Sequence, residues 1–429
     1  MMFGFAGRLQ TRKRRIELEK TEIEGCSRSS GGGSVADISL RVLFVSHTSV
    51  ISGAEHALLE LLRALPESVC PLVLTPGGEL EESLRRERVR VCRIRGTAMS
   101  LRLTPLSILS GFWDLMSSAA SIRLHAARGS VNVIHANSTR SGLMAVLASL
   151  WGGPPVIVHI HDALPDGRIS WLVRRVLLAR SSGLVAISSY THKRFIGDVQ
   201  ATKQPFPILY NPIDVDRFDP SMVSRVQARR QLDLDPDVPL LGIVGQITPW
   251  KGHDTAIRAL AEVRHVHPNV CLLVVGETKF VDRSTRFDNA GFKHELRELS
   301  EELNLEHAVT FLGERADVPL IMRALDVLLM PSWAEPLGRS MLEGMCVATP
   351  VVATRIGGPS EVIRHGETGV LADPHSPHEW AEAILSLLAD PAAAAEMASA
   401  AREVVVRCFD RQAYAESIVL MYQEITHTD

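Results

Sequence analysis

The sequence predicts an α/β protein of two domains, each built around a parallel sheet. Short apolar runs alternate with amphipathic segments along the chain, which is the pattern of parallel α/β architecture. The 429 residues allow two domains of ordinary size, and 46% of them are hydrophobic, enough for two large cores. Polar segments with glycine follow many of the runs, at the strand ends where such sheets bind ligands. We therefore expect two polar rims that face each other across a cleft.

The candidate strands are the short apolar runs. In the first half of the chain they occupy residues 42–46, 71–75, 89–94, 131–135, 155–160 and 183–188. In the second half they occupy residues 239–245, 270–276, 308–313, 326–331 and 350–354. The clearest helices lie between them, at 54–65, 255–266, 293–303 and 379–388, and a further amphipathic helix covers 411–425.

A polar, proline-containing segment, Asn211-Pro212-Ile213-Asp214, separates the two halves, and we place the hinge there. The predicted organisation is a flexible extension at 1–39, a first domain at 40–212, a second domain at 213–405 and a final helical segment at 406–429. The extension carries a basic run at 12–15 and a Ser/Gly-rich linker at 29–34, without the apolar run of a secretory signal. A disordered extension is favoured over a basic tether to anionic lipid, because four cations supply only a few kcal/mol near a membrane.

Composition excludes several function classes. The net charge of −3 argues against a dedicated nucleic-acid binder, which usually has a strongly basic face. The six cysteines are scattered without a CxxC pair, so we interpret them as small buried hydrophobes in a reducing compartment. No apolar run reaches the roughly 18 residues that a membrane-spanning helix needs. We expect a cytoplasmic protein, peripheral at the inner face of the membrane if its acceptor is lipid-linked.

The most informative motif is Pro-Ser-Trp-Ala-Glu-Pro-Leu-Gly, which ends at Gly338 and follows a candidate strand. Pro336 suits the first turn of a helix, and Gly338 allows a ligand to approach the backbone. The free N–H groups of such a helix start attract an anion. Glu335 and Glu343 would lie about 12 Å apart by helical rise. That separation could span a diphosphate, with a sugar at one carboxylate and a ribose at the other; a capped surface helix is the plainer alternative.

Four weaker features stand at other predicted strand ends. Lys251, in Gly-Gln-Ile-Thr-Pro-Trp-Lys-Gly, sits at a helix entry where it can neutralise a phosphate. Gly53, in Ser-Gly-Ala-Glu, suits backbone approach to a phosphate or sugar. Alternation places His159 and His161 on one face of a strand end. The Gly357-Gly358 turn is the fourth, and Asp214-Val215-Asp216 reads as turn chemistry rather than a metal motif.

These residues together resemble glycosyltransferase family 4. The stretch from 326 to 343 and its continuation to Gly369 look like the signature of that family. The Ser-Gly-Ala-Glu turn, the Asn-Pro-Ile-Asp segment with Phe218 and the Trp-Lys-Gly turn extend the resemblance to roughly residues 41–425. The match is highly specific in the second half of the chain and much less so in the first.

The resemblance implies a GT-B fold, in which two Rossmann-like domains bind the acceptor and then the nucleotide sugar. It also implies retention of anomeric configuration, no cofactor and no obligatory metal, with a nucleotide-sugar donor as co-substrate. The catalytic residues it implies are Glu335, near the reacting face of the sugar, and His161, in contact with the sugar. The donor-binding residues it implies are Gly53, Gln246, Lys251, Leu337, Gly338 and Glu343, with Lys251 on the diphosphate and Glu343 on the ribose. The final helix is expected to cross back onto the first domain.

The chain departs from the family pattern at three positions. Gln246 stands where the family has an arginine, so one cation on the diphosphate is lost or supplied elsewhere. Ala348 replaces a glycine, which is tolerable only if that position does not need a positive φ. Leu337 replaces the usual phenylalanine.

We expect sugar transfer from a UDP- or GDP-sugar to a hydroxyl of a glycan, a lipid-linked glycan or a small molecule. Two other classes stay open, a sugar-nucleotide epimerase on the same fold and a non-catalytic scaffold that has lost turnover. Sugar-nucleotide turnover with and without acceptors separates the three. The sequence names neither the sugar, the base nor the acceptor.

Overall fold

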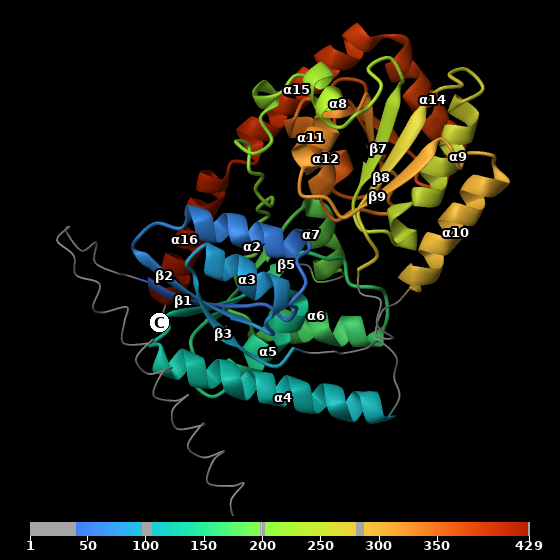
Figure 1. The fold of residues 1–429 in the computed structure, drawn as a ribbon. Helices are drawn as coiled ribbons and strands as arrows, with labels where there is room; N and C mark the ends of the chain where they lie inside the picture. Colours follow the sequence, from blue (N-terminus) through green and yellow to red (C-terminus); the bar gives the residue numbers. More distant parts are fainter. Residues whose placement is uncertain (1–39, 97–104, 198, 200–201, 280–286, 428–429) are drawn as a thin grey trace, which may run out of the picture.

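The computed structural model describes residues 40–96, 105–197, 199, 202–279 and 287–427, so the predicted extension at 1–39 lies outside it. Two six-stranded parallel sheets form the centre of the structure (Figure 1). The first sheet consists of β1 (Leu40–Val45), β2 (Val69–Thr75), β3 (Arg90–Arg93), β4 (Val133–Ala136), β5 (Val156–Ile160) and β6 (Gly183–Ala186). The second consists of β7 (Leu240–Val244), β8 (Cys271–Val275), β9 (Val309–Gly313), β10 (Val327–Met330), β11 (Val351–Thr354) and β12 (Val370–Ala372).

Both sheets have the same strand order, which explains where their ligand sites lie. The order is β3-β2-β1-β4-β5-β6 in the first and β12-β11-β10-β7-β8-β9 in the second. Each sheet therefore has a central pair of strands, β1 with β4 in the first sheet and β7 with β10 in the second. The other strands lie on both sides of that pair. The loops that leave such a pair diverge to opposite faces and open a crevice at the carboxyl ends of the strands. The Ser-Gly-Ala-Glu, Trp-Lys-Gly and Glu-Pro-Leu-Gly segments all follow central strands.

Helices cover both faces of the first sheet. On one face α2 (Gly53–Ala64), α3 (Gly78–Arg86) and α16 (Arg411–His427) bury a core with the strands. On the other face the core includes α4 (Pro105–Arg128), α5 (Thr139–Ser149), α6 (Arg168–Arg180) and α7 (Ser189–Ile196). Strands β4, β5 and β6 are buried along their whole length, as sheets covered on both faces require.

The second sheet is covered in the same way. On one face it packs against α9 (His253–Val263), α10 (Asn289–Glu302) and α14 (Pro377–Ala389). On the other face lie α8 (Arg225–Gln231), α11 (Val318–Ala324), α12 (Arg339–Cys346), α13 (Pro359–Val362) and α15 (Pro391–Cys408). Two short 3₁₀ helices, Pro220–Met222 and Pro249–Lys251, complete the described helical elements.

The last helix, α16, returns from the second domain to the first. It packs against α2, and its Tyr414, Ile418 and Tyr422 are buried in the first-domain core. The Tyr422 hydroxyl lies 2.7 Å from Nδ1 of His135 on β4. Among the described residues no single helix is long and apolar enough to cross a membrane. One bent pair, 377–389 with 391–427, meets that test by length and composition.

Most predicted elements are present, and four expectations need correction. Every predicted strand is found with its ends shifted by at most two residues, but β12 was missed because three residues carry too little pattern. Helix α12 begins at Arg339, so Pro336 lies before the helix and the predicted 12 Å spacing does not apply. Ala348 adopts φ 55°, the left-handed conformation that the glycine it replaces takes more easily. Of the five described cysteines, Cys346 alone is buried.

Candidate functional site

An ion pair joins the loops that follow the central strands of the second sheet. Lys251 Nζ lies 2.6 Å from Glu335 Oε2, and Ser332 Oγ donates to the same carboxylate oxygen at 2.9 Å. Glu335 is 6% exposed. The two loops also meet through their backbones, since Trp333 N–H donates to the Trp250 carbonyl at 2.8 Å. The pair is therefore held by the loops themselves and not only by its own attraction.

Glycines make this close approach possible. Gly252 has φ 70°, and a Cβ there would lie 1.9 Å from the Pro331 carbonyl oxygen. Gly357 has φ 102°, and its Cβ would lie 2.1 Å from the carbonyl oxygen of Glu335. Glu335 N–H donates to the Ile356 carbonyl at 3.1 Å across the same contact. The Gly357-Gly358 turn therefore fixes the backbone that carries Glu335.

The start of α12 lies directly after Glu335. Gly338, with φ 93°, is its N-cap and provides no side chain to cap the first N–H groups. Leu337 is buried, and a Cβ on Gly358 would lie 2.5 Å from its Cα. A helix start without a side-chain cap, next to Lys251, can hold an anion.

Glu343 lies one turn into α12 and is paired within the helix. Arg339 Nε donates to Glu343 Oε1 at 2.8 Å. Burial raises the pKa of Glu343, while Arg339 and then Arg217 act in the opposite direction. The carboxylate that the resemblance assigns to ribose thus already has a cation beside it.

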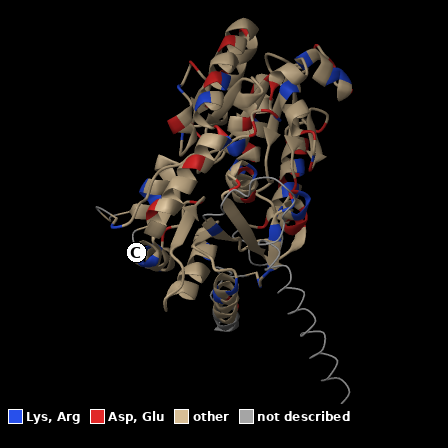
Figure 2. Ribbon diagram, turned by 90° about the vertical axis from the view of Figure 1, so that its left-hand side faces the viewer, with Lys and Arg blue, Asp and Glu red and all other residues tan. Residues whose placement is uncertain are grey.

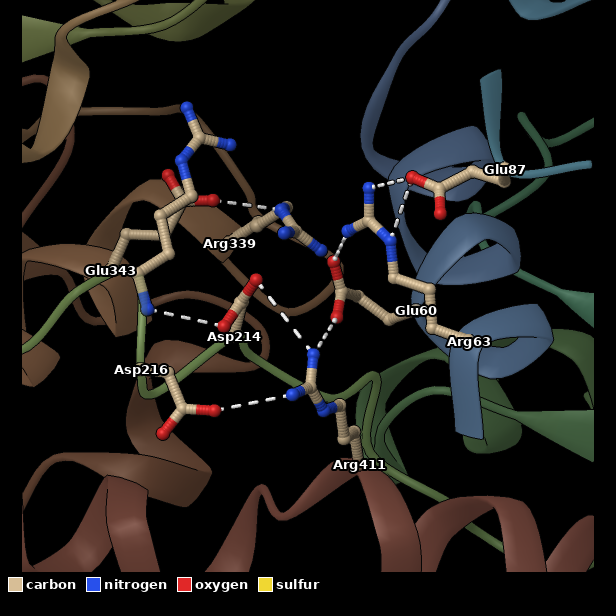
Figure 3. A network of polar contacts seen from close by, with 9 residues as sticks. Glu60, Arg63, Glu87, Asp214, Asp216, Arg339, Glu343 and Arg411 are labelled. Atoms are coloured by element: carbon tan, nitrogen blue, oxygen red, sulfur yellow. Dashed lines mark hydrogen bonds and ion pairs between the residues drawn. The ribbon is translucent and has the colours of Figure 1, made fainter. Parts of the chain in front are cut away.

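A network of charges lies next to this pair and crosses between domains (Figure 3). Arg411 of α16 lies between Glu60 of α2, at 3.5 Å, and the two linker carboxylates. Its distances to Asp214 and Asp216 are 3.8 and 3.1 Å. Asp214 and Asp216 therefore neutralise an arginine. Within the described part of the chain no group of three His, Cys, Asp or Glu side chains is arranged to hold a metal.

In the first domain a histidine and an aspartate follow β5 at the carboxyl end of the sheet. His161 is buried, with Nε2 3.3 Å from Asn137 Oδ1 and Nδ1 3.3 Å from the Asn211 amide nitrogen. Burial lowers the pKa of His161 to about 3, so the ring is neutral. Its ring nitrogens already have protein partners, and its contact with a donor sugar stays a prediction. Asp162 is reached by solvent, yet the surrounding protein raises its pKa.

The pKa of Asp162 responds to charged residues of both domains. Burial raises the pKa of Asp162 most and Arg140 of the first domain lowers it, while smaller effects come from Glu335, which raises it, and Lys251, which lowers it. Gly53 begins α2 on the same rim, and a Cβ there would meet no atom within 4 Å. The space in front of Gly53 is open, as a ligand approaching this turn requires.

Next to Gln246 lies a cation that the sequence motifs did not identify, Lys279. The Gln246 side-chain nitrogen donates to the Lys279 carbonyl at 3.2 Å. Lys279 Nζ lies 3.0 Å from Glu314 and donates to the carbonyl of Ile51, in the first-domain loop before Gly53, at 3.1 Å. Lys279 follows β8 without a recognisable motif, and only the fold brings it to the first-domain loop that contains Ile51.

A second contact across the domain boundary involves Glu361 of α13. Its two carboxylate oxygens accept the N–H groups of Ser189 and Tyr190, at 2.7 and 2.6 Å, at the start of α7. Ser188 Oγ donates to the Pro336 carbonyl at 2.6 Å. The first domain thus touches the segment between Glu335 and Gly338. We call these bonds the α7 junction; from the sequence we singled out only the neighbouring Gly357-Gly358 turn.

Two family models match the chain. Glycosyltransferase Family 4 matches residues 51–217, and Glycosyl transferases group 1 matches residues 224–404. A D-inositol 3-phosphate glycosyltransferase of Corynebacterium jeikeium (strain K411) is 34% identical over 311 residues, 69% of this chain and 73% of that protein. The protein of the same name from Stackebrandtia nassauensis is 31% identical over 301 residues. That match covers 65% of each chain, slightly less than two thirds of the relative.

Solved structures agree with these matches. The Anabaena protein Alr3699/HepE, solved in complex with UDP and glucose, is 25% identical with a TM-score of 0.77. The superposition covers 90% of this chain and 99% of that one. The predicted GT-B fold is confirmed, and the chain belongs to glycosyltransferase family 4.

Proposed function

We propose that the protein is a retaining glycosyltransferase that moves a sugar from a UDP- or GDP-sugar to a hydroxyl acceptor without a divalent metal. The Lys251–Glu335 pair carries the proposal, because it places a cation and a buried carboxylate beside an uncapped helix start. Family membership and a similar structure that contains UDP and glucose support a nucleotide-sugar donor.

In the proposed reaction, the bond between the anomeric carbon and the donor's phosphate oxygen breaks. The acceptor oxygen bonds to the same face of that carbon, its proton passes to the departing phosphate oxygen, and the nucleoside diphosphate leaves. Lys251 and the α12 N–H groups stabilise the charge that grows on the diphosphate. Glu335 faces the positive charge that develops on the sugar. Closure of the domains around the donor limits hydrolysis by water.

Lys279 supplies the diphosphate cation that Gln246 cannot. Gln246 holds the Lys279 backbone, and the ammonium group reaches across to Ile51 beside the open space at Gly53. A lysine there acts as a point charge on a phosphate, as Lys251 does from the other loop. Lys279→Ala should therefore raise the donor KM. Adding Gln246→Arg to that variant should partly lower the donor KM again. An unchanged KM in Lys279→Ala removes the lysine from the donor site.

Metal independence follows from the same charges, since two lysines and a helix start supply a positive field without a metal. Activity should persist in EDTA. Loss of activity in EDTA and its return with magnesium or manganese would overturn this part of the proposal.

The acceptor is a hydroxyl of a glycan, a lipid-linked glycan or a small molecule. The curated relatives are named for inositol 3-phosphate, which makes that compound the first acceptor to test. A thermal-shift screen with UDP, GDP, ADP and their sugars selects the donor, because a ligand of the native state raises Tm.

Product analysis with and without acceptors then decides the reaction class. Glycoside formation only with acceptor, with retained configuration, supports the proposal. A new sugar nucleotide without acceptor indicates an epimerase, and binding without turnover indicates a scaffold. Lys251→Ala should abolish transfer. Arg315→Ala is the matched control, because Arg315 forms an exposed 2.6 Å ion pair with Asp317.

A further inference from the structure

Large apolar side chains are exposed on α4 and α6 and at the turn that follows α5, all in the first domain. Each tryptophan that is exposed in the described part of the chain belongs to this group: Trp113 at 64%, Trp151 at 72% and Trp171 at 52%. We define the α4–α6 surface by the exposed side chains Trp113, Met116, Leu124, Leu150, Trp151, Ile169, Trp171 and Leu172. Monomeric soluble proteins rarely expose such a collection without a binding partner.

The three helices lie on one face of the sheet. Helix α4 packs against α5, and α5 packs against α6 (Figure 1). Their inner residues fill the core on this face of the first sheet, so their outer residues point away from it. On α4 the exposed positions Trp113, Met116, Ala120 and Leu124 follow helical spacing along one stripe. An outer stripe of a soluble helix would be expected to be polar.

The charges of these helices are strongly one-sided. Their sequences contain seven arginines and one acidic residue, Asp114, although the whole chain has a net charge of −3. The helix at the bottom of Figure 2, which is α4, shows basic segments in blue. Exposed tryptophan beside arginine is the composition of helices that lie at a membrane surface.

A cationic cavity of about 340 Å³ lies between α6 and α7, next to Trp171. Arg174, Arg175, Lys193 and Arg194 line it, and Asp166 is its one acidic residue. Arg175 stacks on Trp171, with its guanidinium 4.9 Å from the ring centroid. Asp166 already pairs with Arg194 at 3.2 Å, and the buried Nε of Arg194 lacks a hydrogen-bond partner among the described residues. The cavity is suited to a phosphate group.

We propose that the α4–α6 surface docks on an anionic lipid bilayer, with its tryptophans in the interfacial region and a lipid phosphate in the cavity beside Trp171. Apolar burial and attraction to anionic lipid act together there, each cation near the bilayer adding roughly a fivefold gain in affinity. The docking does not depend on transferase activity. It would place the start of α6, which follows His161 in the chain, at the bilayer.

The test is co-sedimentation of the full-length protein with vesicles of phosphatidylcholine alone or with phosphatidylglycerol. We expect binding to the anionic vesicles only, weakened by salt. Trp171→Ala should weaken it about tenfold and Arg175→Gln about fivefold. Leu420→Ala and Arg86→Gln are the matched controls, because both side chains are exposed away from this surface and should bind as wild type.

Three results would overturn the proposal. One is equal binding to neutral and anionic vesicles, or none to either. Another is wild-type binding by both Trp171→Ala and Arg175→Gln, with binding lost only when the basic run at 12–15 is changed to glutamine. The third is a dimer in sedimentation velocity that Trp171→Ala dissociates, which would assign the surface to a second copy of the chain.

Discussion

The two rims of the cleft are held in different ways. In the second domain, loops approach each other through backbone at Gly252 and Gly357, where no side chain would fit. In the first domain, buried histidines and amides hold the rim, as in the contacts of His161 with Asn137 and Asn211. Backbone contact admits few alternative residues, so the second-domain rim leaves a recognisable motif in the sequence. A side-chain network can be rebuilt from other residues, so the first-domain side leaves a weak one.

The largest difference between the rims should appear at low pH. Burial lowers the pKa of six first-domain histidines, His47, His56, His135, His159, His161 and His192, and of one described in the second domain, His253. Since the folded protein keeps these rings neutral, the unfolded chain binds more protons below pH 6.5. Their contribution is complete above pH 6.5 and is lost as the pH falls toward 3. A ring whose pKa in the folded protein is about 3, such as His135 or His161, costs about 2 kcal/mol at pH 5, and the raised pKa values of Glu55 and Asp162 offset part of this.

Hydrogen exchange between pH 7 and 5, corrected for the intrinsic rate, is the measurement. Peptides of the first domain should lose protection before those of the second. Loss in the opposite order would mean that the histidine network does not dominate the acid response.

Gly357→Ala should disrupt the backbone contact with Glu335 in the second-domain rim. The new Cβ would meet the Glu335 carbonyl, and φ 102° disfavours any side chain. We expect a lower Tm and a loss of kcat/KM on the order of a hundredfold or more. Gly53→Ala is the matched change in the first rim, where space is open, and it should fold normally. Equal Tm values for the two variants would contradict the difference between the rims.

Substitutions of the two glutamates in the second-domain rim should have different kinetic effects. Glu335→Gln should lower kcat on the order of a hundredfold, because charge develops at the sugar only in the transition state. Glu343→Ala should mainly raise the donor KM, about tenfold to a hundredfold, by removing a charge-assisted bond to ribose. Calorimetry with free nucleotide separates them. Normal turnover in Glu335→Gln, or loss of nucleotide binding there alone, would reverse the placement of the donor.

The α7 junction links the two rims and should give an intermediate effect. Glu361→Gln leaves one acceptor oxygen for two N–H groups, which should destabilise the folded protein by about 1–3 kcal/mol. Because Ser188 touches the Pro336 carbonyl nearby, kcat/KM should fall about tenfold with it. Denaturant unfolding and steady-state kinetics test the link. Reduced stability with unchanged kcat/KM would show that the junction only joins the domains.

Ala348→Gly should have the smallest effect. Glycine relieves the left-handed conformation at φ 55° but loses more entropy on folding, so the net gain is about 0.5 kcal/mol. Thermal unfolding should show a slightly higher Tm with unchanged kcat. A lower Tm would mean that the Ala348 side chain contributes packing that outweighs the strain.

The sequence alone determined the clearest helices and every described strand except β12, since the periodicity of apolar residues is a local property. It also identified the family, because Glu335, Gly338 and Glu343 lie in one continuous segment. It overextended that segment as a helix, since no local signal showed that Glu335 would pair with the backbone of Gly357.

Only the tertiary structure decided which distant residues meet. Lys251 and Glu335 are 84 residues apart, and their contact follows from β7 and β10 being neighbours in the sheet. Lys279 and Glu361 likewise have no pattern of their own, and the α4–α6 surface combines segments that are far apart in the sequence. Strand order and domain orientation bring such residues together, and both result from the packing of the whole chain rather than from the spacing of residues within any one segment.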